Sequence, residues 1–270
     1  MKKFLRRTVD TLLSQGHPRV AGYLVAAAVS AVDKRWTRAR WDGEDWEFKW
    51  RDGCLYWDSP LVRPKSVTEQ NMGLFLAAYQ PRSGDTILDV GAGAGTEIGQ
   101  FSRMVGPSGR VIAVEADPAA ARRLRKQVSR LAYRNVDVLE LAVGESEGTV
   151  HLHIAEEGGV ENSIKAVVGR SSIAVPCHRL DSLLENLNVD RISYMKMNIE
   201  GAEYDALLGL GSSISKVAQL CVSCHDFTGD PSQVTFDAVR DYLEAAGLKV
   251  RTLPSNPTAI WENYYLFAEH

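Results

Sequence analysis

The 270-residue sequence predicts an α/β fold, in which helices cover both faces of a mostly parallel, seven-stranded sheet. The first indication is an apolar strand at Thr86–Val90 that continues through alternating glycines into a helix. The second is the alternation of strands and helices that follows, which implies right-handed crossovers. The third is a pair of strands after the last long helix, at 249–253 and 264–269. The composition divides the chain into an N-terminal extension, residues 1–65, and a main domain, residues 66–270.

The extension begins with two expected helices. In the first, apolar residues recur at helical spacing among basic ones: Phe4, Leu5, Val9, Leu12 and Leu13 among Lys2, Lys3, Arg6 and Arg7. Such a basic amphipathic helix can lie on an anionic membrane, pack on its own domain, or cover a second subunit of a homodimer. The second helix is alanine-rich and includes residues 21–32.

A tryptophan-rich hairpin follows. Residues 36–59 hold five of the six tryptophans of the chain. The stretch Trp46–Trp50 alternates in polarity, Asp52-Gly53 is a hairpin turn signal, and residues 55–57 form the returning strand. Aromatic surfaces of this kind either stack on sugars and other flat ligands or fill a small core beneath the hairpin.

The main domain begins with a helix whose cap-like residues start at Ser66 and which ends before Pro81. After the glycine loop we expect strands at 110–115, 136–142, 192–199 and 217–224, and helices at 118–131, 180–187, 202–210 and 231–246. Two more strands, 149–154 and 172–178, form an inserted pair around a polar loop. A ligand of such a sheet binds at the carboxyl ends of the strands, near the switch in strand order.

The glycine loop itself indicates which ligand is bound. A dinucleotide fingerprint, G-x-G-x-x-G, would require a third glycine at the position that Thr96 occupies. The pattern is instead D-x-G-x-G-x-G, formed by Asp89, Gly91, Gly93 and Gly95. Glu115 ends the next strand, where a carboxylate can accept both hydroxyls of a ribose. This combination recurs in enzymes that use S-adenosylmethionine; the alternative is a plain strand-to-helix turn with a solvated Glu115.

Composition limits the remaining classes. Residues 1–40 contain nine Lys or Arg residues against Asp10 and Asp33, while the net charge of the chain is −3, so the main body is acidic and we expect no nucleic-acid partner. Four scattered cysteines favour a reducing, cytoplasmic compartment over a disulfide framework. The C-x-x-C-H run at 221–225 continues a core strand, which argues against haem attachment. No apolar run reaches the ~18 residues that cross a bilayer.

A second stretch, Met195–Glu203, carries polar residues toward the same edge of the sheet. Lys196, Asn198 and Glu200 share one face of the expected strand, and an E-G-x-E run follows. Together with the glycine loop, the Glu115-Ala-Asp117 turn and Leu180-Asp181, this stretch resembles the FkbM family of S-adenosylmethionine-dependent methyltransferases over residues 66–226. The resemblance implies a Rossmann-like class I methyltransferase fold with an antiparallel last strand, and methyl transfer to a hydroxyl of a sugar, a glycoconjugate or a natural product.

For the cofactor, we expect the backbone of Gly91–Gly95, Ala92 included, near the methionine moiety, with Asp89 close by. Glu115 and Ala116 lie at the ribose, and the Ala142-Val143 turn lies near the adenine. Positioning dominates methyl transfer, since the sulfonium already activates the methyl group and the acceptor oxygen has only to be held and deprotonated.

Two side chains compete for the role of base. His225 has an ordinary pKa of about 6.5, which suits neutral pH, and Asp226 could orient it; Glu200 is the other candidate. The family's aspartate is Asn198 here, which removes one carboxylate, so we predict no required metal. Asn162 and Ser163, in the polar loop, and Lys196 are expected on the side of the small-molecule or glycan acceptor.

Two other classes of function stay open at this point. A nicotinamide oxidoreductase could use the same sheet, although Thr96 and the lack of a convincing tyrosine–lysine pair disfavour it. A binding protein that keeps the cofactor fold without turnover is the other, and Asn198 is the sequence feature that points to it.

Overall fold

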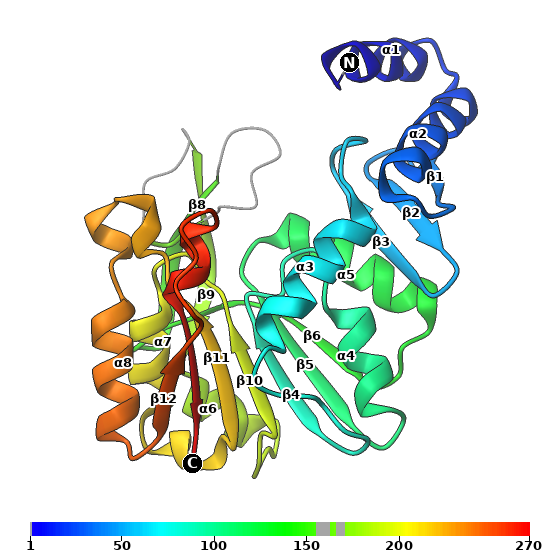
Figure 1. Ribbon diagram of the computed structural model, residues 1–270. Coiled ribbons are helices and arrows are strands. Elements are labelled where there is room, and N and C mark those ends of the chain that lie inside the picture. Colours follow the sequence, from blue (N-terminus) through cyan, green and yellow to red (C-terminus); the bar gives the residue numbers. More distant parts are fainter. Residues whose placement is uncertain (1, 155–162, 166–170) are drawn as a thin grey trace.

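The computed structural model describes residues 2–154, 163–165 and 171–270 (Figure 1). Its centre is a seven-stranded sheet of order β12-β13-β11-β10-β4-β5-β6. The strands are β4 Thr86–Val90, β5 Arg110–Glu115, β6 Val136–Glu140, β10 Tyr194–Met197, β11 Gln219–Ser223, β12 Lys249–Thr252 and β13 Tyr265–Glu269. Strand β13 lies antiparallel between β11 and β12, and the pairs formed by β4, β5, β6, β10 and β11 are parallel. The expected sheet is confirmed.

Helices cover both faces of this sheet. The helices are α3 Pro64–Phe75, α4 Ile98–Val105 and α5 Pro118–Leu131 on one face, and α6 Leu180–Asn186, α7 Glu203–Leu210 and α8 Phe236–Ala245 on the other. Neighbouring residues of β4 point in opposite directions, so Ile87 packs with Phe101 of α4 and Leu88 packs with Leu207 of α7. Each such fully buried side chain contributes roughly 1.5–3 kcal/mol to folding. Two apolar layers therefore fix the sheet from both sides.

The order of the strands reverses at β4. The chain moves outward from β4 to β5 and β6, then returns to place β10 on the other side of β4. The carboxyl ends of β4 and β10 therefore flank the switch point, which is where ligands of open α/β sheets bind. A second sheet, of order β7-β9-β8, stands beside this edge; its strands are β7 Ala142–Val143, β8 Gly148–Ile154 and β9 Ser171–His178.

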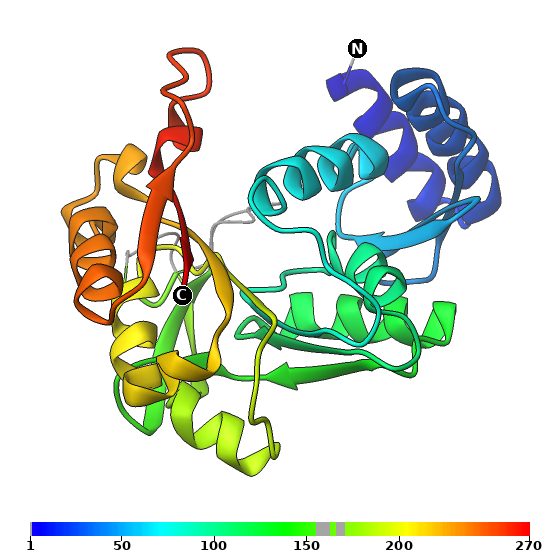
Figure 2. The ribbon, with the colours of Figure 1, turned by 60° about the horizontal axis from the view of Figure 1, so that its bottom comes forward.

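The extension forms a small layered unit of its own. Helices α1 Lys2–Ser14 and α2 Pro18–Asp33 pack on an antiparallel sheet of β1 Arg38–Trp41, β2 Trp46–Trp50 and β3 Gly53–Trp57 (Figure 2). Val9 of α1 is fully buried there, together with Trp46 and Phe48. The apolar side of α1 thus packs on its own domain, and Trp46 and Trp50 fill a core beneath the hairpin.

Charged side chains join the extension to α5. Asp45 is fully buried and lies 2.7 Å from both Arg123 Nε and Lys126 Nζ, and Glu47 accepts a hydrogen bond of 2.6 Å from Arg130. Burial alone would raise the pKa of Asp45, but the hydrogen bonds from Lys126 and Arg123 outweigh it and lower the pKa. The extension is therefore fixed beside the sheet.

Several element boundaries differ from those expected. Helix α3 begins at Pro64 and not at Ser66, since proline suits the first helical position, and the Ser66 hydroxyl instead donates to Asp33 Oδ1 at 2.8 Å. The strand expected at 136–142 breaks at Leu141, whose N–H donates to the carbonyl of Glu115. Strand β1 was not expected, because its alternation of polar and apolar residues covers only four positions.

The helix expected at 231–246 begins only at Phe236. A short 3₁₀ turn at Pro231–Gln233 precedes it. No helix within the described parts of the chain has both the length and the apolar character that crossing a membrane requires.

Candidate active site

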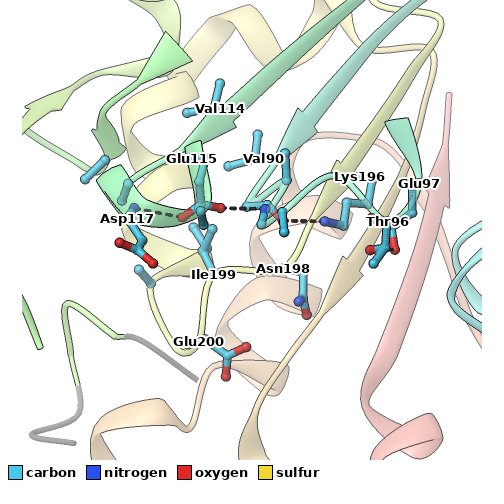
Figure 3. Close-up of a pocket in the computed structure, with 18 of the residues that line it drawn as sticks. Val90, Thr96, Glu97, Val114, Glu115, Asp117, Lys196, Asn198, Ile199 and Glu200 are labelled. Atoms are coloured by element: carbon cyan, nitrogen blue, oxygen red, sulfur yellow. Dashed lines mark hydrogen bonds between the residues drawn. The ribbon is translucent and has the colours of Figure 1, made fainter. Parts of the chain in front are cut away.

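A cavity of about 410 Å³ opens at the carboxyl edge of the sheet, at the switch in strand order (Figure 3). The glycine loop after β4, the turn after β5 and the segment after β10 form most of its wall. Trp57 and Asp58 of the extension complete the wall next to Arg123 of α5. A volume of this size is in the range of cofactor and small-molecule sites.

The glycine loop is built for close backbone packing and for a ligand. Gly91, Gly93 and Gly95 all have positive φ angles, at +78°, +56° and +85°. A Cβ on Gly91 would lie 1.9 Å from the carbonyl oxygen of Asn198, and one on Gly95 would lie 2.5 Å from Gln127 Oε1, whereas a Cβ on Gly93 would enter open space. The first and third glycines therefore permit the fold, and the second leaves room in the cavity.

Glu115 holds the loop in place. Its two carboxylate oxygens accept hydrogen bonds from the backbone N–H groups of Gly93, at 2.6 Å, and Asp117, at 2.8 Å (Figure 3). Burial raises the pKa of Glu115 to about 7, although both hydrogen bonds act in the opposite direction. Each oxygen keeps further acceptor capacity on the cavity side, so the carboxylate suits the diol of a ribose.

The adenine end of the expected site has an apolar wall. Ala116, Ala142 and Val143 line the cavity, as predicted, and Leu141 and Leu152 join them. Sequence reasoning missed Leu152, because it comes from β8 of the second sheet. These side chains form a surface against which a flat base can pack.

Asp89 and Lys196 form a buried ion pair beneath the loop. Their backbones are partners in the pairing of β4 with β10, and Lys196 Nζ lies 2.9 Å from Asp89 Oδ1. The ammonium also donates to the carbonyl of Gly91, at 2.6 Å, and lies 5.0 Å from the ring centre of Phe75. Burial raises the pKa of Asp89 to about 6, while Lys196 acts in the opposite direction. Lys196 therefore supports the loop and also lines the cavity, and the acceptor contact expected from the sequence stays a prediction.

Glu200 ends the opposite wall, beyond β10. Asn198 and Ile199 line the cavity with it. Glu200 has a φ of +54°, and its side chain retains 14% exposure. A non-glycine residue in this conformation costs of order 1–3 kcal/mol, which the surrounding contacts must offset. Those contacts include two hydrogen bonds to the carbonyl of Glu200, from the Ser163 hydroxyl at 2.8 Å and from Gln233 Nε2 at 3.2 Å.

Ser163 was expected on the acceptor side. Its side chain is buried, and its hydroxyl serves the backbone of Glu200. Asn162, the other residue expected there, lies outside the described residues.

His225 stands behind Glu200, between two carboxylates. Its Nε2 lies 3.1 Å from Glu200 Oε2 and its Nδ1 lies 3.0 Å from Glu203 Oε1. Burial alone would lower the pKa of His225, but the hydrogen bonds to Glu200 and Glu203 outweigh it and raise the pKa to about 10. The raised pKa favours the protonated imidazole at neutral pH, and the buried ring is placed to hold Glu200. The role of His225 as the base stays a prediction that this geometry does not favour.

The role predicted for Asp226 is wrong. Its Oδ2 accepts hydrogen bonds of 3.1 Å from the backbone N–H groups of Thr235 and Phe236, at the start of α8, and so it caps this helix. Glu203 orients His225 instead. It is fully buried and also accepts from the Thr235 hydroxyl and from the N–H groups of Ile199 and Gly201.

Glu203 is the functional residue that sequence reasoning did not single out. The signal was present, since the E-G-x-E run places it three residues after Glu200, in the first turn of α7. Within the described ranges, no group of three or more His, Cys, Asp and Glu side chains is placed to hold a metal ion. The expected independence from metals stays a prediction.

The residues around the cavity fit S-adenosylmethionine. Gly93 leaves open space, Glu115 offers its carboxylate, and the wall at Ala142 is apolar. Together with the parallel sheet and its antiparallel last strand, they define the class: a Rossmann-like, class I fold of S-adenosylmethionine-dependent methyltransferases.

The family follows from one comparison. The model of the Methyltransferase FkbM domain matches residues 89–250, more than half of the chain. The chain therefore belongs to the FkbM methyltransferase family, as its motifs indicated, and its cofactor is S-adenosylmethionine.

Individual relatives are more distant. The 2-O-methyltransferase NoeI of Sinorhizobium fredii is 24% identical over 173 residues, which cover 58% of this chain and 70% of that protein. A protein-L-isoaspartate O-methyltransferase of Aeropyrum pernix is 34% identical over 104 residues, 37% of this chain and 39% of that protein. The corresponding enzyme of Ignicoccus hospitalis is 34% identical over 87 residues, 31% of this chain and 41% of that protein. The chain thus matches less than half of the length of the last two enzymes.

The solved structures that resemble this chain are also distant in sequence. A methyltransferase FkbM from Methylobacillus flagellatus covers 72% of this chain and 46% of its own, with 15% identity and a TM-score of 0.49. Aeropyrum pernix fibrillarin, in complex with natively bound S-adenosyl-L-methionine, covers 83% of this chain and 93% of its own, with 14% identity and a TM-score of 0.44.

Proposed function

We propose that the protein is an S-adenosylmethionine-dependent O-methyltransferase that acts on a hydroxyl group of a sugar, a glycoconjugate or a natural product. The observation that carries the proposal is the carboxylate of Glu200, which lines the cavity while His225, itself held by Glu203, contacts it from behind. A hydroxyl acceptor must lose its proton as the methyl group arrives, and a positioned carboxylate supplies the base. The likeness to a 2-O-methyltransferase supports the same class of acceptor.

Each part of the cavity has a task in this reaction. The bound cofactor supplies a methyl group on a positively charged sulfur. Gly93 and Glu115 would hold the methionine and ribose parts of that cofactor, and the apolar wall at Ala142 would hold its adenine. Asn198 offers an amide to orient the acceptor, and Glu200 accepts the proton of the acceptor hydroxyl. Water is excluded by Trp57 and the remaining wall.

The position of Glu200 is set by its neighbour. His225 Nε2 lies 3.1 Å from Glu200 Oε2 and so fixes the direction of the other carboxylate oxygen. Proton transfer to a base positioned in this way contributes about 10²–10⁴-fold to the rate.

The carboxylate of Glu200 also favours a hydroxyl acceptor over a carboxylate acceptor. Two relatives are protein-L-isoaspartate O-methyltransferases by name, and the carboxylate of an isoaspartate carries no proton at neutral pH. Such an acceptor would be repelled by the negative charge of Glu200. It also has no proton for Glu200 to accept. A hydroxyl acceptor makes use of Glu200, and we therefore favour it.

A two-stage experiment tests the proposal. S-adenosylhomocysteine should raise the melting temperature of the protein and NAD should not. Methyl transfer from labelled S-adenosylmethionine should then occur with a panel of glycosides and phenols, and Glu200→Gln should lower kcat by about 10²–10⁴-fold while it binds S-adenosylhomocysteine as the wild type does.

The outcomes separate the alternatives. Cofactor binding without transfer to any hydroxyl acceptor would favour a protein that has lost turnover. Transfer to peptide carboxylates alone would replace the proposed acceptor class. Full activity of Glu200→Gln would remove Glu200 from the mechanism.

A further inference from the structure

Helix α2 of the extension is apolar on two sides. One side, which includes Ala21, Val25 and Val29, is buried against the sheet of the extension. The opposite side carries Val20, Tyr23 and Leu24, whose exposed fractions are 49%, 77% and 40%. We call these three residues the outer face of α2. Helices that are apolar all round are normally covered on every side, so this face calls for a partner.

The exposed charges at the two ends of α2 have one sign. Arg19 lies in the first turn of the helix and Lys34 follows its last residue, and both are exposed. Asp33 is the one acidic residue of α2, and it is buried, where it accepts hydrogen bonds from the backbone of Lys65 and the Ser66 hydroxyl. An apolar helical face with basic residues at both ends is the pattern of a helix that lies in the interface of an anionic bilayer.

The wider distribution of charge supports the same partner. Residues 1–40 carry a net charge of +7 in a chain whose total is −3, so the rest of the molecule is strongly negative. Phe4 and Trp36 are also exposed in this segment, and the guanidinium of Arg38 lies 5.0 Å from the ring centre of Trp36. An anionic surface attracts the extension and repels the main body, which fixes the orientation of the molecule.

A second copy of the chain fits this face less well. In a two-fold dimer the same patch meets itself, so Arg19 and Lys34 of one copy would approach those of the other. Charge complementarity therefore favours lipid. We infer that the outer face of α2, with its basic flanks, is a docking surface for an anionic lipid bilayer.

The extension lies close to the cavity, so docking through α2 would bring the cavity near the bilayer. The extension lies toward the carboxyl ends of the parallel strands, at the end of the molecule opposite the C-terminus (Figure 1). Trp57 and Asp58 at its edge line the cavity itself. A protein docked through α2 therefore holds the cavity close to the lipid interface, where amphiphilic acceptors are concentrated.

The test uses the full chain and vesicles, with no need for an acceptor. The protein should co-sediment with phosphatidylcholine vesicles that contain phosphatidylglycerol, and much less with phosphatidylcholine alone. Tyr23→Glu/Leu24→Glu should reduce the partition coefficient by at least about tenfold, and Arg19→Ala or Lys34→Ala by about fivefold each. Binding should also weaken as salt is added.

A matched control adds the same two charges at the far end of the molecule. Ser83→Glu/Ser212→Glu lies at the amino-terminal edge of the sheet and should bind vesicles as the wild type does. Unchanged melting temperatures and S-adenosylhomocysteine binding show that each variant is folded.

Three results would overturn the inference: no binding of the wild type to anionic vesicles, equal binding by Tyr23→Glu/Leu24→Glu, or a wild-type dimer that this variant converts to a monomer without any vesicle binding. Because the experiment measures lipid binding, its result does not depend on whether the protein transfers methyl groups.

Discussion

The imidazole of His225 lies 3.1 Å from the carboxylate of Glu200, on the side that faces away from the cavity. Glu203 holds the other ring nitrogen at 3.0 Å, so a buried cation stands between two acids. The arrangement supports the proposal that Glu200 accepts the proton and that His225 positions it. It also makes the stability of the fold depend on pH.

His225→Gln should therefore change the pH dependence of stability. The pKa of His225 in the folded protein, about 10, lies above its ordinary value of about 6.5. The stabilisation is thus fully present below pH 6.5 and is lost as the pH rises toward 10. In urea unfolding at pH 6, the variant should be less stable than the wild type by about 3 kcal/mol, and this difference should shrink by pH 10.

The exposed His151 gives a control for that measurement. His151→Gln should follow the wild-type pH profile, because nothing buried depends on its charge. A constant difference between His225→Gln and the wild type across this range would contradict a protonated His225.

The fold was largely predictable because its signals are local. The apolar run at Thr86–Val90, the glycines after it and the later strands each show their period within a few residues. Strand β1 was missed because the alternation of Arg38–Trp41 covers only four residues. Besides its backbone pairing, an ion pair of Arg40 with Glu47 and a ring contact of Trp41 with Trp46 hold it on β2. The break at Leu141 was missed because its hydrogen bond goes to Glu115, on a different strand.

The site was predictable to the same extent. Glu115, Gly91 and Gly93 belong to one local motif with its neighbouring strand and line the cavity, whereas Gly95 packs against Gln127. Their contacts with the cofactor stay a prediction. The pair of Asp89 and Lys196 was not predicted, because it depends on β10 lying next to β4, more than a hundred residues earlier in the chain. The contact between Glu203 and His225 likewise depends on the packing of α7 beside the end of β11.

Glu115 should make cofactor affinity depend on pH. With a pKa of about 7 in the free protein, its carboxyl is largely protonated at pH 6. Ribose hydroxyls donate to the ionised form, so binding lowers this pKa and releases a proton. The affinity for S-adenosylhomocysteine should accordingly rise between pH 6 and pH 8 in calorimetry. Glu115→Gln should bind about 10- to 100-fold more weakly at pH 8, with a flatter profile.

A carboxylate on the neighbouring strand serves as the control here. Glu140 forms a surface ion pair with Arg125 at the end of β6. Glu140→Gln should leave both the affinity and its pH profile unchanged. A Glu115→Gln variant with the wild-type slope would assign the pH dependence to another group.

Gly91 and Gly93 should respond differently to the same substitution. In Gly91→Ala the new Cβ would meet the Asn198 carbonyl oxygen at 1.9 Å, so the free energy of unfolding should fall by about 3 kcal/mol or more. In Gly93→Ala the Cβ enters the cavity, and the positive φ alone costs about 1–2 kcal/mol. Gly93→Ala should therefore fold but bind S-adenosylhomocysteine at least about tenfold more weakly. Equal stability losses, with cofactor affinity intact, would contradict this division of roles.

Asp89 and Lys196 offer a test of whether their pair is structural. Asp89→Asn leaves the buried ammonium of Lys196 without its counter-charge, and Lys196→Met leaves the buried carboxylate of Asp89 without its own. Each single variant should therefore lower the free energy of unfolding by about 3–5 kcal/mol. The double variant removes both charges and should be more stable than the sum of the two losses predicts, by about 1–3 kcal/mol. Cofactor affinity should still fall in the double variant, because the carbonyl of Gly91 loses the ammonium that donates to it at 2.6 Å. Strict additivity in urea unfolding would show that the two charges act separately, since a coupled pair cannot lose the same interaction twice.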